Sequence, residues 1–297
     1  MSTHGLRQAG CVLVLLGALR AQGALFDYDR RAPLEVKELD RQQLDGGVVV
    51  RDVTFSAAPG QPAVKAYLVE PVGQTPCAGV LWLHWLGAPE TTNRTQFLIE
   101  AIRLAPKGVV SLLIDAMWAA PNWYETRVPE EDFAASVRQV ITIRRAMDLL
   151  LSQPRVDAAR VGLVGHDYGG MYGMLASGVD QRAKASVFIA TTSSLTHWAF
   201  FARQPTSKAE YLRQNSVIEL TDFVRRIKNA ATLLQFAKSD AYVSRSDTAV
   251  LLAAFNEPKE RRFYDADHAM TPAVISEERE AWLLEHLGAA KDAGSGP

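Results

Sequence analysis

The chain has 297 residues, a formal net charge of −1, 48% hydrophobic residues and 22% charged residues. This composition is typical of a globular protein, and a chain of this length buries a substantial core by itself. The balanced charge, with no aromatic residues set in a basic stripe, gives no support for a nucleic-acid partner or a basic membrane patch.

The N-terminal segment differs in character from the rest of the chain. Arg7 precedes the apolar run 11–19, and small residues follow it. This pattern predicts a secretory signal peptide over 1–23, and hence a secreted or periplasmic protein with no stable membrane insertion after cleavage. The alternative is an uncleaved helix or anchor, although the run is short for a membrane span. Cleavage would leave Cys77 without a partner for an internal disulfide, and we expect it to be a small buried residue.

Apolar strands alternate with amphipathic segments from residue 48 onward. Strands are predicted at 48–56, 64–70, 78–85, 109–116, 161–167, 184–190, 232–237 and 261–265, with helices at 91–104, 129–151 and 272–287. This alternation predicts one α/β domain, 24–288, whose mostly parallel sheet is covered by helices on both faces. Residues 191–230 form a short cap-like insertion in this interpretation, and the small, polar tail 289–297 is predicted to be disordered.

The most informative motif is Gly165-His166-Asp167-Tyr168-Gly169, which follows an apolar strand and precedes a helix-like segment. Glycine two residues on either side of Asp167 indicates a turn too tight for a Cβ atom. A sharp strand-to-helix turn of this kind lifts one side chain above a sheet as a nucleophile. The alternative is that Asp167 is an ordinary turn residue.

Two further residues follow strands in the order expected for a catalytic triad. Asp240 comes after the strand 232–237, and His268 comes after the strand 261–265. Alone, Asp240 fits a helix N-cap and His268 an ordinary loop histidine. Together with Asp167 they stand, in chain order, where the α/β-hydrolase superfamily, which these residues resemble, keeps its nucleophile, acid and histidine, and the resemblance implies a catalytic triad.

With these pieces in order, residues 48–287 resemble the α/β-hydrolase superfamily, and most of all its dienelactone-hydrolase-like branch. The resemblance implies that two backbone N–H groups form an oxyanion hole, those of Leu86 and Tyr168. Trp85 stands where the family usually has glycine, and His84 is expected to order this loop. Aspartate replaces the serine or cysteine that is usual at the position of Asp167.

Aspartate at this position changes the plausible chemistry. A carboxylate is already ionised at neutral pH, so Asp167 can attack directly and form a covalent ester. His268 would then activate water, and Asp240 would orient His268. Direct attack suits a saturated carbon, as in an epoxide or a carbon–halogen bond. In an alternative mechanism, Asp167 and His268 act as bases on water without a covalent step.

The residues leave four functions open. Hydrolysis of a small ester or lactone is the activity that the resemblance implies. An epoxide hydrolase would use tyrosines to protonate the opening oxygen, for which Tyr211 and Tyr124 are candidates. A haloalkane dehalogenase is disfavoured, because Tyr168 and Leu86 stand where its halide donors are expected. The fourth possibility is a non-catalytic ligand-binding homologue, which would have no need to retain His268 and Asp240.

The remaining expectations concern the pocket and its surroundings. The substrate is expected to be a small molecule in a pocket lined by Trp85, Trp118, Trp198 and Tyr211; in the alternative, Trp198, Phe200 and Phe201 only pack the insertion down. Asp115 is expected to order the loop after its strand, and His166 to serve packing. No metal-ligand motif or phosphate-binding glycine loop occurs, so no cofactor is predicted. Oligomeric state stays open.

Overall fold

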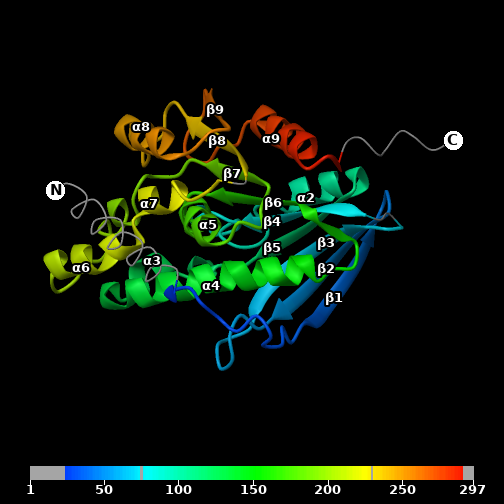
Figure 1. The fold of residues 1–297 in the computed structure, drawn as a ribbon, viewed down its shortest axis with the longest axis horizontal. Helices are drawn as coiled ribbons and strands as arrows, with labels where there is room; N and C mark the ends of the chain where they lie inside the picture. Colours follow the sequence, from blue (N-terminus) through cyan, green and yellow to red (C-terminus); the bar gives the residue numbers. More distant parts are fainter. Residues whose placement is uncertain (1–23, 74–75, 229, 290–297) are drawn as a thin grey trace, which may run out of the picture.

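The computed structural model describes residues 24–73, 76–228 and 230–289. Its described strands form one sheet of nine, in the order β1-β2-β3-β5-β4-β6-β7-β8-β9 (Figure 1). They are β1 (Lys37–Leu44), β2 (Val48–Phe55), β3 (Val64–Pro71), β4 (Cys77–Leu83), β5 (Val109–Ile114), β6 (Val156–His166), β7 (Ala185–Ile189), β8 (Ala231–Ala237) and β9 (Lys259–Tyr264). The six strands β4 to β9 run parallel, whereas β1, β2 and β3 pair antiparallel at one edge of the sheet, where β3 also pairs antiparallel with β5.

Helices cover both faces of the sheet (Figure 1). One face carries α2 (Leu98–Leu104) and α9 (Ala273–His286). The other carries α4 (Asp132–Leu151), α5 (Tyr168–Val179), α7 (Leu220–Val224) and α8 (Arg245–Ala254). The remaining helices are α3 (Trp123–Thr126), α6 (Lys208–Asn215) and the 3₁₀ turns Ala105–Lys107, Met117–Ala119, Pro129–Glu131, Leu195–His197 and Ser216–Ile218.

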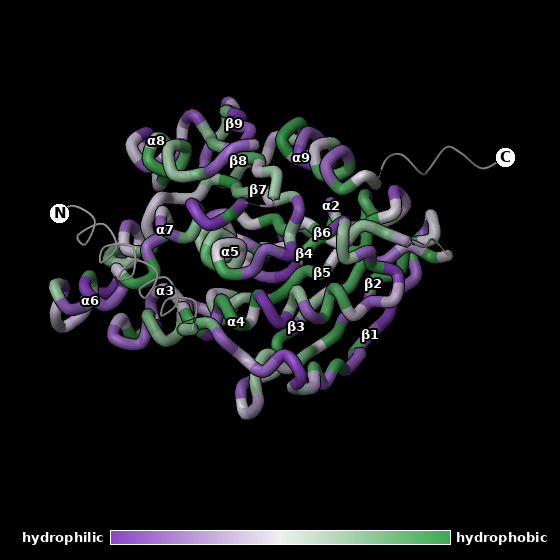
Figure 2. The backbone as a smooth tube through the Cα atoms, viewed as in Figure 1, coloured by the Kyte–Doolittle hydropathy of each residue, from purple (hydrophilic) through white to green (hydrophobic). Residues whose placement is uncertain are grey.

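The central strands are apolar on both sides because each face of the sheet has its own core. In β4, Val80 and Trp82 pack into the core under α2 and α9. Leu81 and Leu83 pack into the core under α4 and α5. Successive side chains of a strand point to opposite faces, which is why every residue of β4 is buried. Figure 2 shows apolar residues on the central strands and α5, and mostly hydrophilic residues on the edge strand β1.

The predicted mostly parallel sheet with helices on both faces is confirmed. The strand β1 was missed, because its residues are almost all exposed and show no apolar alternation. Backbone pairing to β2 holds it in place. The described part of the insertion 191–230 contains α6 and α7. The predicted signal peptide, 1–23, and residues 290–297 of the predicted tail lie outside the described residues.

Among the described residues, no helix is long and apolar enough to cross a membrane.

The two-sided core makes a direct prediction for stability. Leu81 on β4 is 0% exposed, whereas Leu39 on β1 is 60% exposed. We expect Leu81→Ala to lower the free energy of unfolding by about 2–5 kcal/mol, through lost burial and a residual cavity. The control Leu39→Ala, also on a strand, should change it by less than about 0.5 kcal/mol. Urea unfolding measures both, and equal effects would contradict the assignment of β4 to the core.

Candidate active site

Asp167 lies at the sharp turn between β6 and α5, with φ 56° and ψ −117°. Residues other than glycine rarely adopt a positive φ, and such backbone strain costs about 1–3 kcal/mol. The turn is held by the Asp167 N–H, which donates to the Ile189 carbonyl at 2.9 Å, and by the Thr191 hydroxyl, which donates to the Asp167 carbonyl at 3.2 Å. A Cβ atom at Gly165 would clash with the Gly169 carbonyl, so the glycine spacing has the predicted steric reason.

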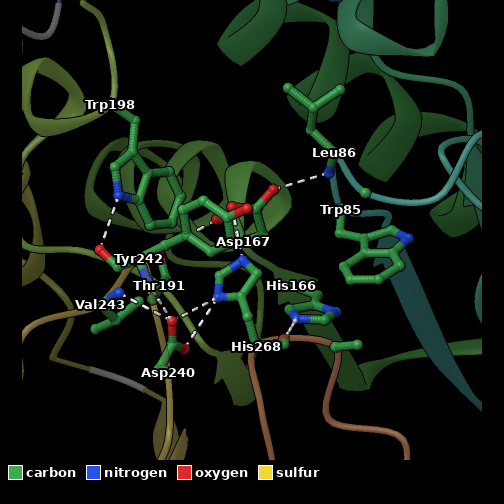
Figure 3. Close-up of polar contacts among 12 residues, drawn as sticks. Trp85, Leu86, His166, Asp167, Thr191, Trp198, Asp240, Tyr242, Val243 and His268 are labelled. Carbon is green, nitrogen blue, oxygen red and sulfur yellow. Dashed lines mark hydrogen bonds and ion pairs between the residues drawn. The ribbon is translucent and has the colours of Figure 1, made fainter. Parts of the chain in front are cut away.

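The three predicted triad residues meet at the carboxyl ends of β6, β8 and β9 (Figure 3). Nε2 of His268 lies 3.3 Å from Oδ1 of Asp167, and Nδ1 lies 2.9 Å from Oδ2 of Asp240. Oδ1 of Asp240 accepts the backbone N–H groups of Tyr242 at 2.8 Å and Val243 at 2.9 Å. The imidazole is thus clamped between two carboxylates, one of which is fixed by backbone donors.

The predicted oxyanion-hole donor Leu86 contacts the nucleophile position itself. Its N–H donates to Oδ2 of Asp167 at 2.8 Å (Figure 3). The two oxygens of this carboxylate therefore have different partners, Oδ1 facing His268 and Oδ2 facing Leu86. Tyr168, the other predicted donor, is the first residue of α5, where an N–H has no partner within the helix.

The charges in this group reinforce one another. Burial by itself lowers the pKa of His268, but hydrogen bonds to Asp167 and Asp240 outweigh it and raise the pKa to about 9. Burial would raise the pKa of Asp240, but the hydrogen bond from His268 lowers it below its ordinary value. At neutral pH the resting site therefore holds an imidazolium between carboxylates.

His166, predicted to serve packing, also joins the two loops of the site. Its Nε2 donates to the His268 carbonyl at 2.9 Å, since a carbonyl can only accept, so Nδ1 accepts from the Gln96 amide at 2.7 Å. The Gln96 oxygen in turn accepts the Trp85 N–H at 2.7 Å. The Trp85 ring stacks on His166 at 5.1 Å (Figure 3). Burial holds the pKa of His166 well below its ordinary value, so it stays neutral in this chain.

His84 hydrogen-bonds within the loop that carries Trp85. Its Nε2 accepts the Ala116 N–H at 3.0 Å, and its Nδ1 then donates to the Trp85 carbonyl at 2.7 Å. Burial lowers the pKa of His84 to about 4. Asp115 is not among the residues that line the cavity: it accepts the Arg94 N–H at 2.8 Å and pairs with the Arg94 guanidinium at 3.0 Å. His84 thus joins the loop of Trp85 to Ala116, whereas the side chain of Asp115 contacts Arg94 and not the loop after its own strand, which it was predicted to order.

A cavity of about 900 Å³ opens over Asp167 and His268. Three of the predicted pocket residues line it: Trp85, Trp118 and Trp198. The prediction that Tyr211 lines the pocket was wrong. Its hydroxyl donates to Asp132 at 2.8 Å and its ring packs on Phe200, outside the cavity lining. The lining also contains Tyr168 and Tyr124, which the sequence analysis named as an oxyanion-hole donor and as a candidate proton donor, and Phe201, which it named only in the packing alternative. The aromatic lining residues that the sequence analysis did not single out are Trp123 and Tyr242. The sequence signal that could have identified such residues is their position in loops after parallel strands, because these loops gather at one edge of the sheet.

Other potential chemistry is remote from this cavity. Cys77 is buried, and burial raises the pKa of its thiol. In the described ranges, no group of three or more His, Cys, Asp or Glu side chains is arranged to hold a metal ion.

Comparisons with solved structures identify the fold. No family model matches the sequence, and no curated protein matches it. Among solved structures, an acetyl xylan esterase from a Paenibacillus species has a TM-score of 0.72 and 21% identity, covering 92% of this chain and 93% of that one. Acetyl xylan esterase 1 from a Thermoanaerobacterium species has a TM-score of 0.72 and 14% sequence identity, and the match covers 90% of this chain and 93% of that one. An S-formylglutathione hydrolase from Agrobacterium tumefaciens has a TM-score of 0.65 and 14% sequence identity, and the match covers 85% of this chain and 100% of that one. The chain therefore has an α/β-hydrolase fold.

The raised pKa of His268 predicts how this group contributes to stability. Its ordinary pKa is 6.5 and its folded pKa is about 9. A raised folded pKa gives stability that is complete below pH 6.5 and is lost as pH rises through 9. We expect the difference in unfolding free energy between the wild type and His268→Gln to shrink across this window. Urea titrations at each end measure it, and a difference independent of pH would contradict the imidazolium assignment.

Proposed function

We propose that this protein is a hydrolase in which Asp167 forms a covalent aspartyl ester with its substrate. The observation that carries the proposal is the division of the Asp167 carboxylate. Oδ1 faces His268 and accepts no backbone N–H from the described residues, whereas Oδ2 already accepts the Leu86 N–H. A donor at Oδ2 stabilises the negative charge that develops there when water later attacks the ester.

In the first step, Oδ1 of Asp167 bonds to a saturated carbon and the bond from that carbon to its leaving group breaks. A carboxylate requires no base for this attack. When the leaving group is the oxygen of an epoxide, it departs on the side of the carbon opposite Oδ1, and we propose that it takes up, relayed by solvent, the proton that the His268 imidazolium gives up. The raised pKa of His268 supports this role, because it keeps the proton on the resting imidazolium.

The second step uses the loss of charge at Asp167. Once Asp167 is an ester, only Asp240 stabilises the imidazolium, so His268, now neutral, can accept a proton from water. The water oxygen attacks Cγ of Asp167 and negative charge develops on Oδ2. Collapse breaks the Cγ–Oδ1 bond, and the expelled alkoxide takes the proton of the new carboxylic acid. Asp167 returns as a carboxylate and His268 as an imidazolium.

An epoxide fits this site better than a haloalkane. The imidazolium supplies the proton that an oxygen leaving group needs and a halide does not. The predicted tyrosine pair does not carry the role: Tyr211 lies outside the cavity lining, and the Tyr124 hydroxyl donates to the Trp198 carbonyl. Tyr168 lines the cavity instead, and burial raises its pKa well above the ordinary value, so it remains a donor.

Hydrolysis of an ester or lactone is the second candidate. It is supported by the structural neighbours, several of which are named as esterases. In that reaction the substrate carbonyl oxygen needs the oxyanion-hole donors, and Oδ2 of Asp167 occupies the Leu86 N–H. Asp167 and His268 would then act as bases on water, with no bond from Asp167 to the substrate.

Isotope labelling separates the two candidates. In ¹⁸O-labelled water, turnover of an epoxide is expected to place ¹⁸O in Asp167, because water attacks Cγ and the original Oδ1 leaves with the product. Mass spectrometry of the peptide that contains Asp167 measures this. A peptide containing Asp265, an 89% exposed carboxylate, is the control and should stay unlabelled. Epoxide turnover without label in Asp167 would contradict the covalent mechanism, and turnover of esters alone would select the second candidate.

Removal of the base should trap the intermediate. In His268→Gln the first step loses its imidazolium proton donor and is expected to slow, whereas the second step loses its proton acceptor altogether. On prolonged incubation we therefore expect the protein mass to rise by the mass of the epoxide and the adduct to map to Asp167. Asp167→Asn should show no adduct under the same conditions. An adduct on both variants would indicate adventitious alkylation elsewhere.

A further inference from the structure

The cavity is walled by aromatic side chains that come from separate loops at the carboxyl edge of the sheet. Trp85 follows β4, and Trp123 and Tyr124 follow β5. Trp198 and Phe201 follow β7, and Tyr242 follows β8. Residues so far apart in the sequence converge only through the fold, which points to a common ligand.

The rings form a box beside the nucleophile. Tyr168, directly after Asp167, lies at the centre of this box, which consists of Trp118, Trp123, Tyr168, Trp198 and Phe201. The ring centroids of Trp118, Trp123 and Trp198 lie 5.7, 5.6 and 5.7 Å from that of Tyr168. Trp118, Tyr168 and Trp198 are buried, whereas Phe201 and Tyr242 are 65% and 56% exposed. Exposed apolar surface at the rim of a concave site is typical of a ligand groove.

The charges of the lining select against anions. Besides His268, the charged residues that line the cavity are Asp167, Glu125 and Asp267, and none of the described lining residues is Lys or Arg. Arg127 lies against the rings of Trp123 and Tyr124, 5.9 and 5.1 Å from their centroids, and pairs with Asp132. It is not part of the cavity lining.

We propose that this cavity takes a substrate in which the electrophilic carbon is attached to an uncharged aromatic ring. The inference deepens the proposed function and rests on it for the electrophile alone. A planar ring gains offset or edge-to-face contacts with Trp123, Tyr168 and Trp198 beyond its apolar area. A saturated ring of the same size gains only the area, and a carboxylate on the ring is repelled by the acidic lining.

Binding of inert probes to the wild-type protein tests this without any reaction. The probes are benzyl alcohol, cyclohexylmethanol and benzoate, titrated at neutral pH by ligand-observed NMR. We expect benzyl alcohol to bind several-fold tighter than cyclohexylmethanol and about tenfold tighter than benzoate. Equal affinity for the first two, or benzoate binding as tightly as benzyl alcohol, would overturn the proposal.

Two variants locate the effect in the box. Trp123→Leu and Phe201→Leu keep an apolar wall but remove a ring, so they should bring the affinity for benzyl alcohol close to that for cyclohexylmethanol. Phe201 is 65% exposed, so its replacement does not threaten folding. Phe263→Leu, at a 46% exposed phenylalanine on β9 outside the cavity lining, is the matched control and should retain the preference. Loss of the preference in Phe263→Leu alone would place the ring site elsewhere.

The outcomes also separate this inference from the proposed function. Aromatic preference without ¹⁸O in Asp167 would leave the ligand class standing and remove the covalent mechanism. Label in Asp167 with no aromatic preference among the probes would do the reverse.

Discussion

The backbone at Asp167 is the constraint on which the site depends. A positive φ at a residue with a Cβ is unfavourable, and here it is imposed by the turn from β6 directly into α5. This conformation lifts the carboxylate between the Leu86 N–H and the His268 imidazole. The preceding residue, His166, is buried by the same turn and ties the loops of Trp85 and His268 together through Gln96. One strained residue thus fixes the positions of Asp167, the Leu86 N–H and His268 relative to one another.

The second determinant is the charge pattern, in which one imidazolium lies between the carboxylates of Asp167 and Asp240. Opposite charges at hydrogen-bond distance offset the penalty of burying each of them. The arrangement also couples chemistry to protonation, because any reaction that neutralises Asp167 weakens the hold on the His268 proton. In a serine enzyme the histidine begins as the base. In the mechanism proposed for this protein it begins as the acid and becomes a base only after Asp167 has reacted.

The sequence was sufficient to place Asp167, Asp240 and His268 at one edge of the sheet, because their signals are local. The glycines around Asp167, the position of Asp240 after the apolar strand β8, and the position of His268 after β9 each mark the carboxyl end of a parallel strand. Long-range contacts were beyond it: Gln96 bonds to His166 from 70 residues away. Tyr211 was misplaced because an insertion has no strand to fix its direction. The edge strand β1 was missed because pairing with β2, and not apolar burial, holds it.

The same geometry weighs against a purely ligand-binding role. A pocket for an uncharged ligand gains nothing from three buried ionisable groups, and replacing such groups with apolar residues is often neutral or stabilising. Backbone strain at Asp167 is likewise unfavourable for folding unless it positions something. Both features place one carboxylate oxygen of Asp167 against His268 while a backbone donor holds the other. A binding protein has no use for that asymmetry between Oδ1 and Oδ2, whereas an enzyme that forms and hydrolyses an aspartyl ester requires it.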